Sequence, residues 1–256
     1  GFYEGPVAEK IVAAVRKAGG IMTTEDMKNY RAVLREPIRG TYRGYDIISM
    51  PPPSSGGVHL IEMLNILEGY DLAKLNREES LHIIAEAMKR AYADRATFMG
   101  DPDAVKMPVA GLISKKYAAA LRAQIGTRAA PSTEIRSGNP ADFEGQNTTH
   151  FSVIDRDGNA VSNTYTLNFS YGLGLVAEGT GVLLNNELDD FTSKPGTANA
   201  YGLVGYNANL PGPNRRPLSS MTPTIFLKDG KPFLITGSPG GSRIISTVLQ
   251  IIVNVI

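Results

Sequence analysis

The sequence predicts a layered α/β fold of the α+β class, in which helices flank antiparallel strands. The first half of the chain is mainly helical and contains one hairpin. The second half carries strands with alternating apolar residues, and a helix follows them at the end. Antiparallel strands flanked by helices at both ends of the sequence fit a sandwich of layers.

The helices of the first half are predicted from apolar residues at helical spacing. In residues 6–17 these are Val7, Ile11, Val12 and Val15. Gly19-Gly20 ends this helix, and Thr24 with Met27 and Tyr30 indicates a short capped helix. Further helices are predicted over residues 58–67, 80–99 and 115–125. The side chains of residues 80–99 expected to face the core are Leu81, Ile84, Ala85, Met88, Ala91 and Tyr92.

Turn signals locate the strands. A hairpin is predicted over residues 38–50, with Gly40 and Gly44 interrupting the apolar pattern. Asp157-Gly158 and Asp229-Gly230 lie between apolar runs, which is a strong signal for a tight hairpin turn. Strands are predicted at residues 149–155, 160–167, 181–184, 224–228 and 232–236, and a final helix from about Ser242. Residues 192–217 form a long loop rich in Gly, Pro and Asn, which is usually functional or disordered.

Composition excludes several classes of function. The 256 residues fit one large α/β domain or two small ones. A net charge of +1 argues against general attraction to nucleic acid or acidic membranes. The absence of cysteine excludes disulfides and cysteine catalysis, and a count of only three histidines argues against a histidine-rich metal site. No apolar run approaches the roughly 20 residues of a membrane span. Gly1 and Ile256 look like cut ends of something longer.

A polar linker runs directly into a predicted strand at Thr148. The turn-rich segment 131–147 precedes it, and the alternating residues Phe151 and Val153 follow. If the Asn147–Thr148 bond were cut, Thr148 would gain a free α-amine beside its own hydroxyl, and that amine can act as the general base. The alternative is an ordinary junction between a loop and a strand.

Three further segments carry groups with possible chemistry. Ser238–Ser242 joins a strand to a helix and fits an anion cradle, an oxyanion hole or a plain tight turn. Carboxylates in residues 185–191 can bind an ammonium group or a metal. Hydroxyls in residues 215–223 can hold a carboxylate or cap a turn.

Other candidates are interpreted as structural. His150 and Ser152 share one face of a strand, but no acid is placed to orient the histidine, so they do not form a catalytic pair. Residues 54–57 lack the Gly-x-Ser-x-Gly pattern of a nucleophile elbow. The cluster at residues 92–95 is interpreted as a salt-bridged helix end.

Taken together, these segments resemble the γ-glutamyltranspeptidase family (γ-glutamyltransferases, or glutathione hydrolases). The motifs QNTTHFSVIDRDGNAV, LLNNELDDF, RRPLSSMTPTI and TGSPGGSRI occur in that order, with MPPPSSGG and YADR upstream. The resemblance covers essentially the whole chain. It implies the αββα sandwich of N-terminal-nucleophile hydrolases and a precursor that cuts itself. Residues 1–147 would then be the C-terminal part of the large subunit, and residues 148–256 the N-terminal part of the small subunit.

The resemblance implies a role for each matching residue. Thr148 is the implied nucleophile, and cleavage falls between Asn147 and Thr148. Thr166 is implied to orient that nucleophile, and the amides of Gly240 and Gly241 to form the oxyanion hole. The residues implied to bind the α-ammonium of the γ-glutamyl head are Asn168, Glu187 and Asp190. Those implied to bind its α-carboxylate are Ser219 and Ser220. Tyr201 is implied to lie on a lid over the site and to pair with Asn168.

The activity implied is acyl transfer from a γ-glutamyl donor such as glutathione to water, an amino acid or a dipeptide. The resemblance further implies a heterodimer of large and small subunit, a periplasmic or secreted location, and an α-carboxylate-binding arginine outside this chain. No cofactor or metal is expected. The alternatives are a cephalosporin (glutaryl) acylase, a relative acting on poly-γ-glutamate, and, from another class, a non-catalytic anion- or ligand-binding module.

Overall fold

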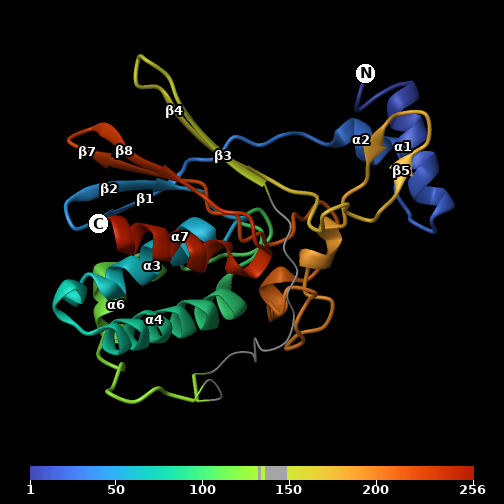
Figure 1. Ribbon diagram of the computed structural model, residues 1–256. Helices are drawn as coiled ribbons and strands as arrows, with labels where there is room; N and C mark the ends of the chain where they lie inside the picture. Colours follow the sequence, from blue (N-terminus) through green and yellow to red (C-terminus); the bar gives the residue numbers. More distant parts are fainter. Residues whose placement is uncertain (132–133, 136–148) are drawn as a thin grey trace.

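A four-stranded antiparallel sheet lies at the centre of the protein (Figure 1). The computed structural model describes residues 1–131, 134–135 and 149–256. The order of the sheet is β1-β2-β7-β8. Its strands are β1 Ile38–Tyr42, β2 Tyr45–Ser49, β7 Thr224–Lys228 and β8 Lys231–Thr236. Strands distant in sequence therefore meet at the β2–β7 pair, where Ile47 lies opposite Phe226.

A second layer of strands covers this sheet. The hairpin of β3 (Thr149–Ile154) and β4 (Ala160–Tyr165) contacts β7 and β8, and Figure 1 shows it on the side away from the helices. Ser162 ties the layers together, since its Oγ donates to the Thr236 carbonyl and accepts from the Thr224 amide. A small third pair joins β5 (Val176–Ala177) to β6 (Val182–Leu183).

Helices pack against the opposite face of the four-stranded sheet (Figure 1). In the described residues the α-helices are α1 Pro6–Lys17, α2 Thr24–Asn29, α3 Gly56–Leu67, α4 Arg77–Phe98, α5 Val109–Leu112, α6 Lys115–Arg122 and α7 Ile244–Val255. Short 3₁₀ turns lie at η1 Leu72–Lys74, η2 Glu187–Asp190, η3 Asn207–Asn209 and η4 Gly241–Arg243. Helix α3 is buried along its whole length, because α4, α6, α7 and the sheet surround it.

The main core lies between the sheet and helices α3, α4 and α7. Phe226 and Ile47 from the sheet pack with Leu64, Val248 and other fully buried side chains. A separate small core joins α1 to β5 through Ala8, Ile11 and Ala177, at a distance from the main sheet (Figure 1). Apolar residues of the β3–β4 hairpin, including Phe151 and Val161, are about half exposed. The described residues therefore form helix, sheet and sheet layers, and no described helix covers the outer sheet.

Most predicted elements are confirmed with small changes at their ends. The hairpins at 38–50, 149–167 and 224–236 are present, as are the helices at 6–17, 24–29 and 115–122. The cap of α2 is Thr23, which forms a capping box with Asp26. The final helix begins at Ile244, after the 3₁₀ turn η4. Strand β5 and helix α5 were not predicted, since they span too few residues to show a period.

The predicted inward face of α4 is partly wrong. Leu81 and Ala85 are exposed, whereas Glu86 and Arg90 are buried. The two charged side chains satisfy each other, with Arg90 Nη1 lying 2.6 Å from Glu86 Oε2. The spacing of apolar residues cannot reveal a buried ion pair, so the buried face predicted for α4 is rotated about the helix axis from the observed one.

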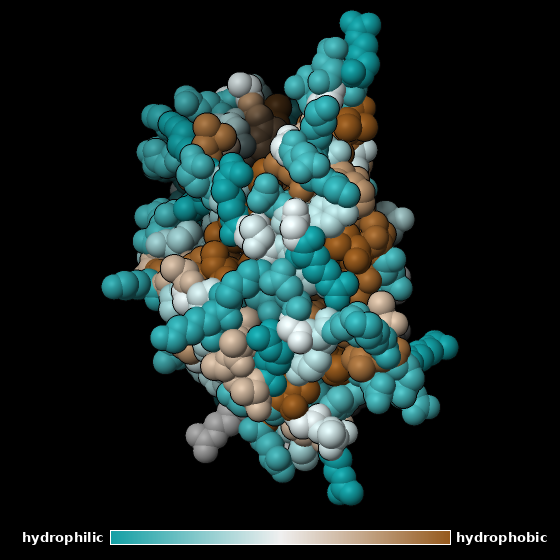
Figure 2. Space-filling view, turned by 90° about the vertical axis from the view of Figure 1, so that its left-hand side faces the viewer, coloured by the Kyte–Doolittle hydropathy of each residue, from teal (hydrophilic) through white to brown (hydrophobic). Residues whose placement is uncertain are grey.

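Within the described ranges, no helix is both long enough and apolar enough to cross a bilayer. Figure 2 shows one face of the molecule, on which hydrophilic side chains surround several separate hydrophobic patches.

Candidate active site

Loops from separate parts of the chain meet around a small cavity of about 20 Å³. Residues 166–168 after β4, the turn η2, the loop before β7 and the start of α7 all contribute to it. Its lining includes seven of the residues singled out by sequence: Thr166, Asn168, Asp190, Tyr201, Ser219, Ser220 and Gly241. Glu187 and Gly240 lie next to this lining in sequence but do not line the cavity themselves.

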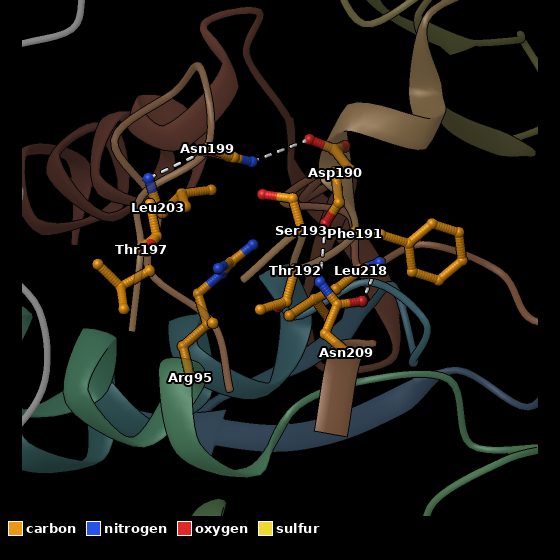
Figure 3. Close-up of a pocket in the computed structure, with 12 residues that line it drawn as sticks. Arg95, Asp190, Phe191, Thr192, Ser193, Thr197, Asn199, Leu203, Asn209 and Leu218 are labelled. Atoms are coloured by element: carbon orange, nitrogen blue, oxygen red, sulfur yellow. Dashed lines mark hydrogen bonds between the residues drawn. The ribbon is translucent and has the colours of Figure 1, made fainter. Parts of the chain in front are cut away.

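Asp190 also lines a second, smaller cavity of about 10 Å³ (Figure 3). Arg95, from α4, projects into the centre of this group in Figure 3. The carboxylate of Asp190 accepts a long bond of 3.5 Å from Asn199 Nδ2, and its carbonyl oxygen accepts from Asn209 Nδ2 at 2.7 Å. The backbone of Asp190 is thus held firmly, while its carboxylate has only a weak partner there.

Burial dominates the electrostatics of the two acids at η2. Burial, and to a lesser extent the Glu187 carboxylate, raises the pKa of Asp190 to about 7, against the opposing attraction of Arg95. Burial also raises the pKa of Glu187. Glu187 Oε1 is buried and has no hydrogen-bond partner in the described part of the chain. Two carboxyl groups short of donors provide a place where a cation would gain strong charge-assisted hydrogen bonds.

Backbone strain and hydrogen bonds fix the strand end that carries Thr166 and Asn168. Asn168 has a positive φ of 72°, which non-glycine residues seldom adopt. Its amide donates to Thr166 Oγ1 at 2.9 Å, and its side-chain Nδ2 donates to the Asn186 carbonyl at 3.0 Å. The turn that ends β4 is therefore joined directly to the residue before η2.

Tyr201 closes the cavity from the long loop between η2 and β7. Its hydroxyl donates to the carbonyl oxygen of Asn168, and its ring packs edge-on against Phe169. The ring also lies against Gly241, where an added Cβ would overlap it. Gly241 has a φ of 51°, so both its backbone conformation and its neighbour require glycine.

The Ser219–Ser220 segment is held by the turn that opens α3. The Ser55 amide and the Ser55 hydroxyl both donate to the Ser219 carbonyl, at 2.9 and 2.8 Å. The Ser54 hydroxyl donates to the Met221 carbonyl at 2.7 Å. Gly56 allows this approach, since a Cβ there would overlap the Met221 carbonyl. The serines at 54 and 55 are thus structural, as predicted.

The interpretation of residues 92–95 as a salt-bridged helix end is wrong. Among the described residues neither Asp94 nor Arg95 makes an ion pair. Asp94 accepts from the Tyr117 hydroxyl at 2.7 Å, and the Tyr92 hydroxyl donates to the Ser242 carbonyl at 2.5 Å. Arg95 is only 4% exposed and lines the second cavity, next to Asp190. Sequence reasoning missed its position, although the YADR motif had marked it.

Residues 147 and 148 lie outside the described residues, so the proposed nucleophile and cleavage site have no described geometry. The described chain resumes at Thr149, which pairs with Tyr165, the neighbour of Thr166. His150 bonds to Thr164 Oγ1 at 2.9 Å and to Ser152 Oγ at 3.0 Å, and burial lowers its pKa. These partners include no acid, in agreement with a structural role.

Comparison with known proteins places the chain among relatives of two kinds. The family model of gamma-glutamyltranspeptidase matches residues 1–256. The glutathione hydrolase proenzyme of Escherichia coli (strain K12) is 56% identical over 256 residues, which cover 99% of this chain and 44% of that protein. The acylase ACY 1 proenzyme of Pseudomonas sp. (strain SE83) is 43% identical over 258 residues, covering 99% of this chain and 44% of that protein.

Solved structures agree with this placement. A cephalosporin acylase from Bacillus halodurans superposes with a TM-score of 0.80 at 28% identity, covering 99% of this chain and 43% of that one. The γ-glutamyltranspeptidase of Helicobacter pylori superposes with a TM-score of 0.51 at 49% identity, covering 53% of this chain and 40% of that one. The layers described above are therefore a part of the αββα fold expected from the sequence. The chain spans less than half the length of these relatives. Because the family model matches every residue from 1 to 256, the chain belongs to the gamma-glutamyltranspeptidase family.

Proposed function

We propose that this chain is the catalytic part of a self-processing γ-glutamyl acyltransferase and hydrolase. The observation that carries the proposal is the pairing of opposite chemistries around one cavity. The carboxyl group of Asp190 lines this cavity, with the buried acid Glu187 close to it on η2, and the hydroxyl residues Ser219 and Ser220 line the same cavity. A γ-glutamyl head is a zwitterion, so it has an ammonium for the first pair and a carboxylate for the second.

The proposed reaction passes through an acyl-enzyme. Thr148 Oγ attacks the γ-carbonyl carbon of a donor such as glutathione, and the free α-amine of Thr148 takes the hydroxyl proton. The amides of Gly240 and Gly241 hold the oxyanion, while Thr166 orients the nucleophile. The C–N bond then breaks, and the protonated amine returns the proton to the leaving nitrogen. Water, an amino acid or a dipeptide attacks the ester and releases glutamate or a new γ-glutamyl compound.

The same threonine carries out the proposed maturation. In an uncut chain Thr148 has no free amine, and its hydroxyl attacks the preceding carbonyl carbon in an N-to-O acyl shift. Hydrolysis of that ester separates residues 1–147 from residues 148–256. These are the proposed C-terminal part of a large subunit and N-terminal part of a small subunit in one heterodimer. By likeness to the family, the proposed location is periplasmic or extracellular.

The experiment compares Thr148→Ala with Thr149→Ala in the full-length natural protein. Intact mass reports cleavage between 147 and 148, and γ-glutamyl-p-nitroanilide reports transfer. Thr148→Ala is expected to stay uncut and inactive. Thr149→Ala is the matched control, since it removes the neighbouring hydroxyl and should process and turn over normally. A Thr148→Ala protein that still separates into two subunits would refute the assignment. Thr148→Ser is expected to retain partial function.

A second candidate function is that of a cephalosporin or glutaryl acylase. The structural similarity to the Bacillus halodurans acylase, with a TM-score of 0.80, favours it. A glutaryl group lacks the α-ammonium, so it leaves Asp190 and Glu187 without a partner. The ratio of turnover on γ-glutamyl- and glutaryl-p-nitroanilide separates the two candidates. We expect the γ-glutamyl compound to be preferred, and the reverse preference would favour the acylase.

A further inference from the structure

Arg95 is a buried cation behind the proposed substrate pocket. It lies near the C-terminal end of α4 and is 4% exposed. Its Nε donates to Ser55 Oγ at 2.8 Å, and its Nη2 donates to Ser220 Oγ at 3.0 Å. One guanidinium therefore joins the turn that opens α3 to the serine segment that faces the cavity.

The direction of these hydrogen bonds sets the direction of the serine protons. A guanidinium has donors only, so both serine oxygens must accept from Arg95. Ser55 then uses its own proton toward the Ser219 carbonyl, 2.8 Å away. Ser220 Oγ accepts from Arg95, and its proton is left to point to another acceptor. That proton can therefore be donated into the cavity that Ser220 lines.

The charge on Arg95 is poorly compensated. No carboxylate lies within ion-pair distance of it among the described residues. The acid that influences it across the site is Asp190, and burial lowers the pKa of the guanidinium. A buried cation without a paired anion is costly, and an anion that arrived at the serine pair would reduce that cost. Arg90, on the same helix, differs because Glu86 pairs with it directly.

We propose that Arg95 is a positioning residue for the substrate α-carboxylate. It acts through Ser220, whose hydroxyl proton it directs toward the carboxylate, and it supplies positive potential to that end of the pocket. Arg95 thereby makes the site specific for acyl groups that carry an α-carboxylate. This inference rests on the proposed γ-glutamyl function.

The test measures kcat and KM of the full-length, processed protein on two anilides. γ-Glutamyl-p-nitroanilide carries the α-carboxylate, whereas γ-aminobutyryl-p-nitroanilide keeps the ammonium and lacks the carboxylate. For Arg95→Gln we expect kcat/KM on the first substrate to fall about 30-fold or more, mainly through KM. On the second substrate we expect a change of less than about 3-fold, because no carboxylate is there to be positioned. Arg95→Lys should lose less kcat/KM than Arg95→Gln, since lysine keeps the positive charge but lacks the planar guanidinium that donates to both Ser55 and Ser220.

A double mutant separates a positioning role from a structural one. If Arg95 acts through Ser220, Ser220→Ala should remove most of the benefit of Arg95, so the double variant should be little worse than Ser220→Ala alone. Arg90→Gln is the matched control for the loss of a buried arginine from α4, and it should affect both substrates equally. If Arg95→Gln does not fold, Ser55→Ala removes one anchor of Arg95 and should show the same substrate selectivity on a smaller scale.

The outcomes distinguish two failures. Equal losses on both anilides in the Arg95 and Ser55 variants would overturn the inference while leaving the γ-glutamyl function intact. A wild-type protein that processes normally but turns over neither anilide would overturn the proposed function, and the inference with it.

Discussion

Replacing Asp190 with asparagine isolates the proposed ammonium site. The substitution keeps the shape of the side chain and removes its charge. Among the residues that the structure describes, the carboxylate has one weak side-chain donor, Asn199 at 3.5 Å, so an ammonium would be its main partner. Loss of one member of a partly buried, hydrogen-bonded charge pair costs about 2–4 kcal/mol. At about 1.4 kcal/mol for each factor of ten, kcat/KM should fall about 30- to 700-fold on γ-glutamyl-p-nitroanilide.

The assay compares that loss with the effect on glutaryl-p-nitroanilide, which keeps the carboxylate and lacks the ammonium. On the glutaryl compound Asp190→Asn should lose little. Asp189→Asn is the matched control, because Asp189 is the adjacent, exposed acid on the same turn. An equal fall on both substrates would refute the reasoning, since it would show that Asp190 does not recognise the ammonium.

The pH profile provides a second measure of the same group. Burial raises the pKa of Asp190 to about 7, so below that pH the free protein holds it largely protonated and unable to pair with an ammonium. We therefore expect kcat/KM on the γ-glutamyl substrate to fall as pH drops through about 7. Groups that act on both substrates cancel in the ratio of the two profiles, so that ratio reports the two acids proposed to bind the ammonium, Asp190 and Glu187. A ratio that stays constant from pH 5 to pH 8 would contradict this assignment.

Two further predictions concern the backbone and the core. Gly241→Ala should lower both stability and activity, because it combines a positive φ with overlap of the Tyr201 ring. Gly230→Ala has the same backbone cost in open space, so similar thermal midpoints and activities for the two variants would contradict the role of the ring. Burial raises the pKa of Glu62 from 4.5 to about 8, so the folded protein holds that proton more tightly and stability falls as pH rises toward 8. Glu62→Gln should flatten this fall between pH 6.5 and 8 in thermal unfolding, and an unchanged slope would count against it.

Local signals predicted the elements whose stabilisation is itself local. The hairpin turns at Asp157-Gly158 and Asp229-Gly230 are specified by residues that accept the turn conformation, and α1 by its apolar face. Helix α4 was predicted in extent but not in orientation. Its buried face includes the Glu86–Arg90 pair, which is stable only because each charge satisfies the other after folding. The pair has no apolar period, so the sequence could not indicate it.

The candidate site was not predictable from local patterns in the same way. Asn168, Asp190, Tyr201 and Ser220 come from segments far apart in the chain, and no periodicity relates them. The resemblance of these segments to a known family is what predicted that the four residues share one site. The family resemblance did not predict the position of Arg95. A charged residue near a helix end is usually solvated or ion-paired, and only the packing of α4 against residues 55 and 220 reveals that it faces inward.

The arrangement of charge around the cavity explains why a zwitterion suits the site better than a simple anion or cation. Arg95 lies behind the serine pair, and Asp190 lies beside Glu187 on η2. A buried charge is costly alone, and Arg95 and Asp190, which both line the second cavity of about 10 Å³, do not form an ion pair with each other. A head group with a carboxylate and an ammonium compensates both at once, whereas a glutaryl or γ-aminobutyryl group leaves one protein charge unpaired. Specificity for the γ-glutamyl group would then come as much from the penalty on singly charged substrates as from attraction to the right one.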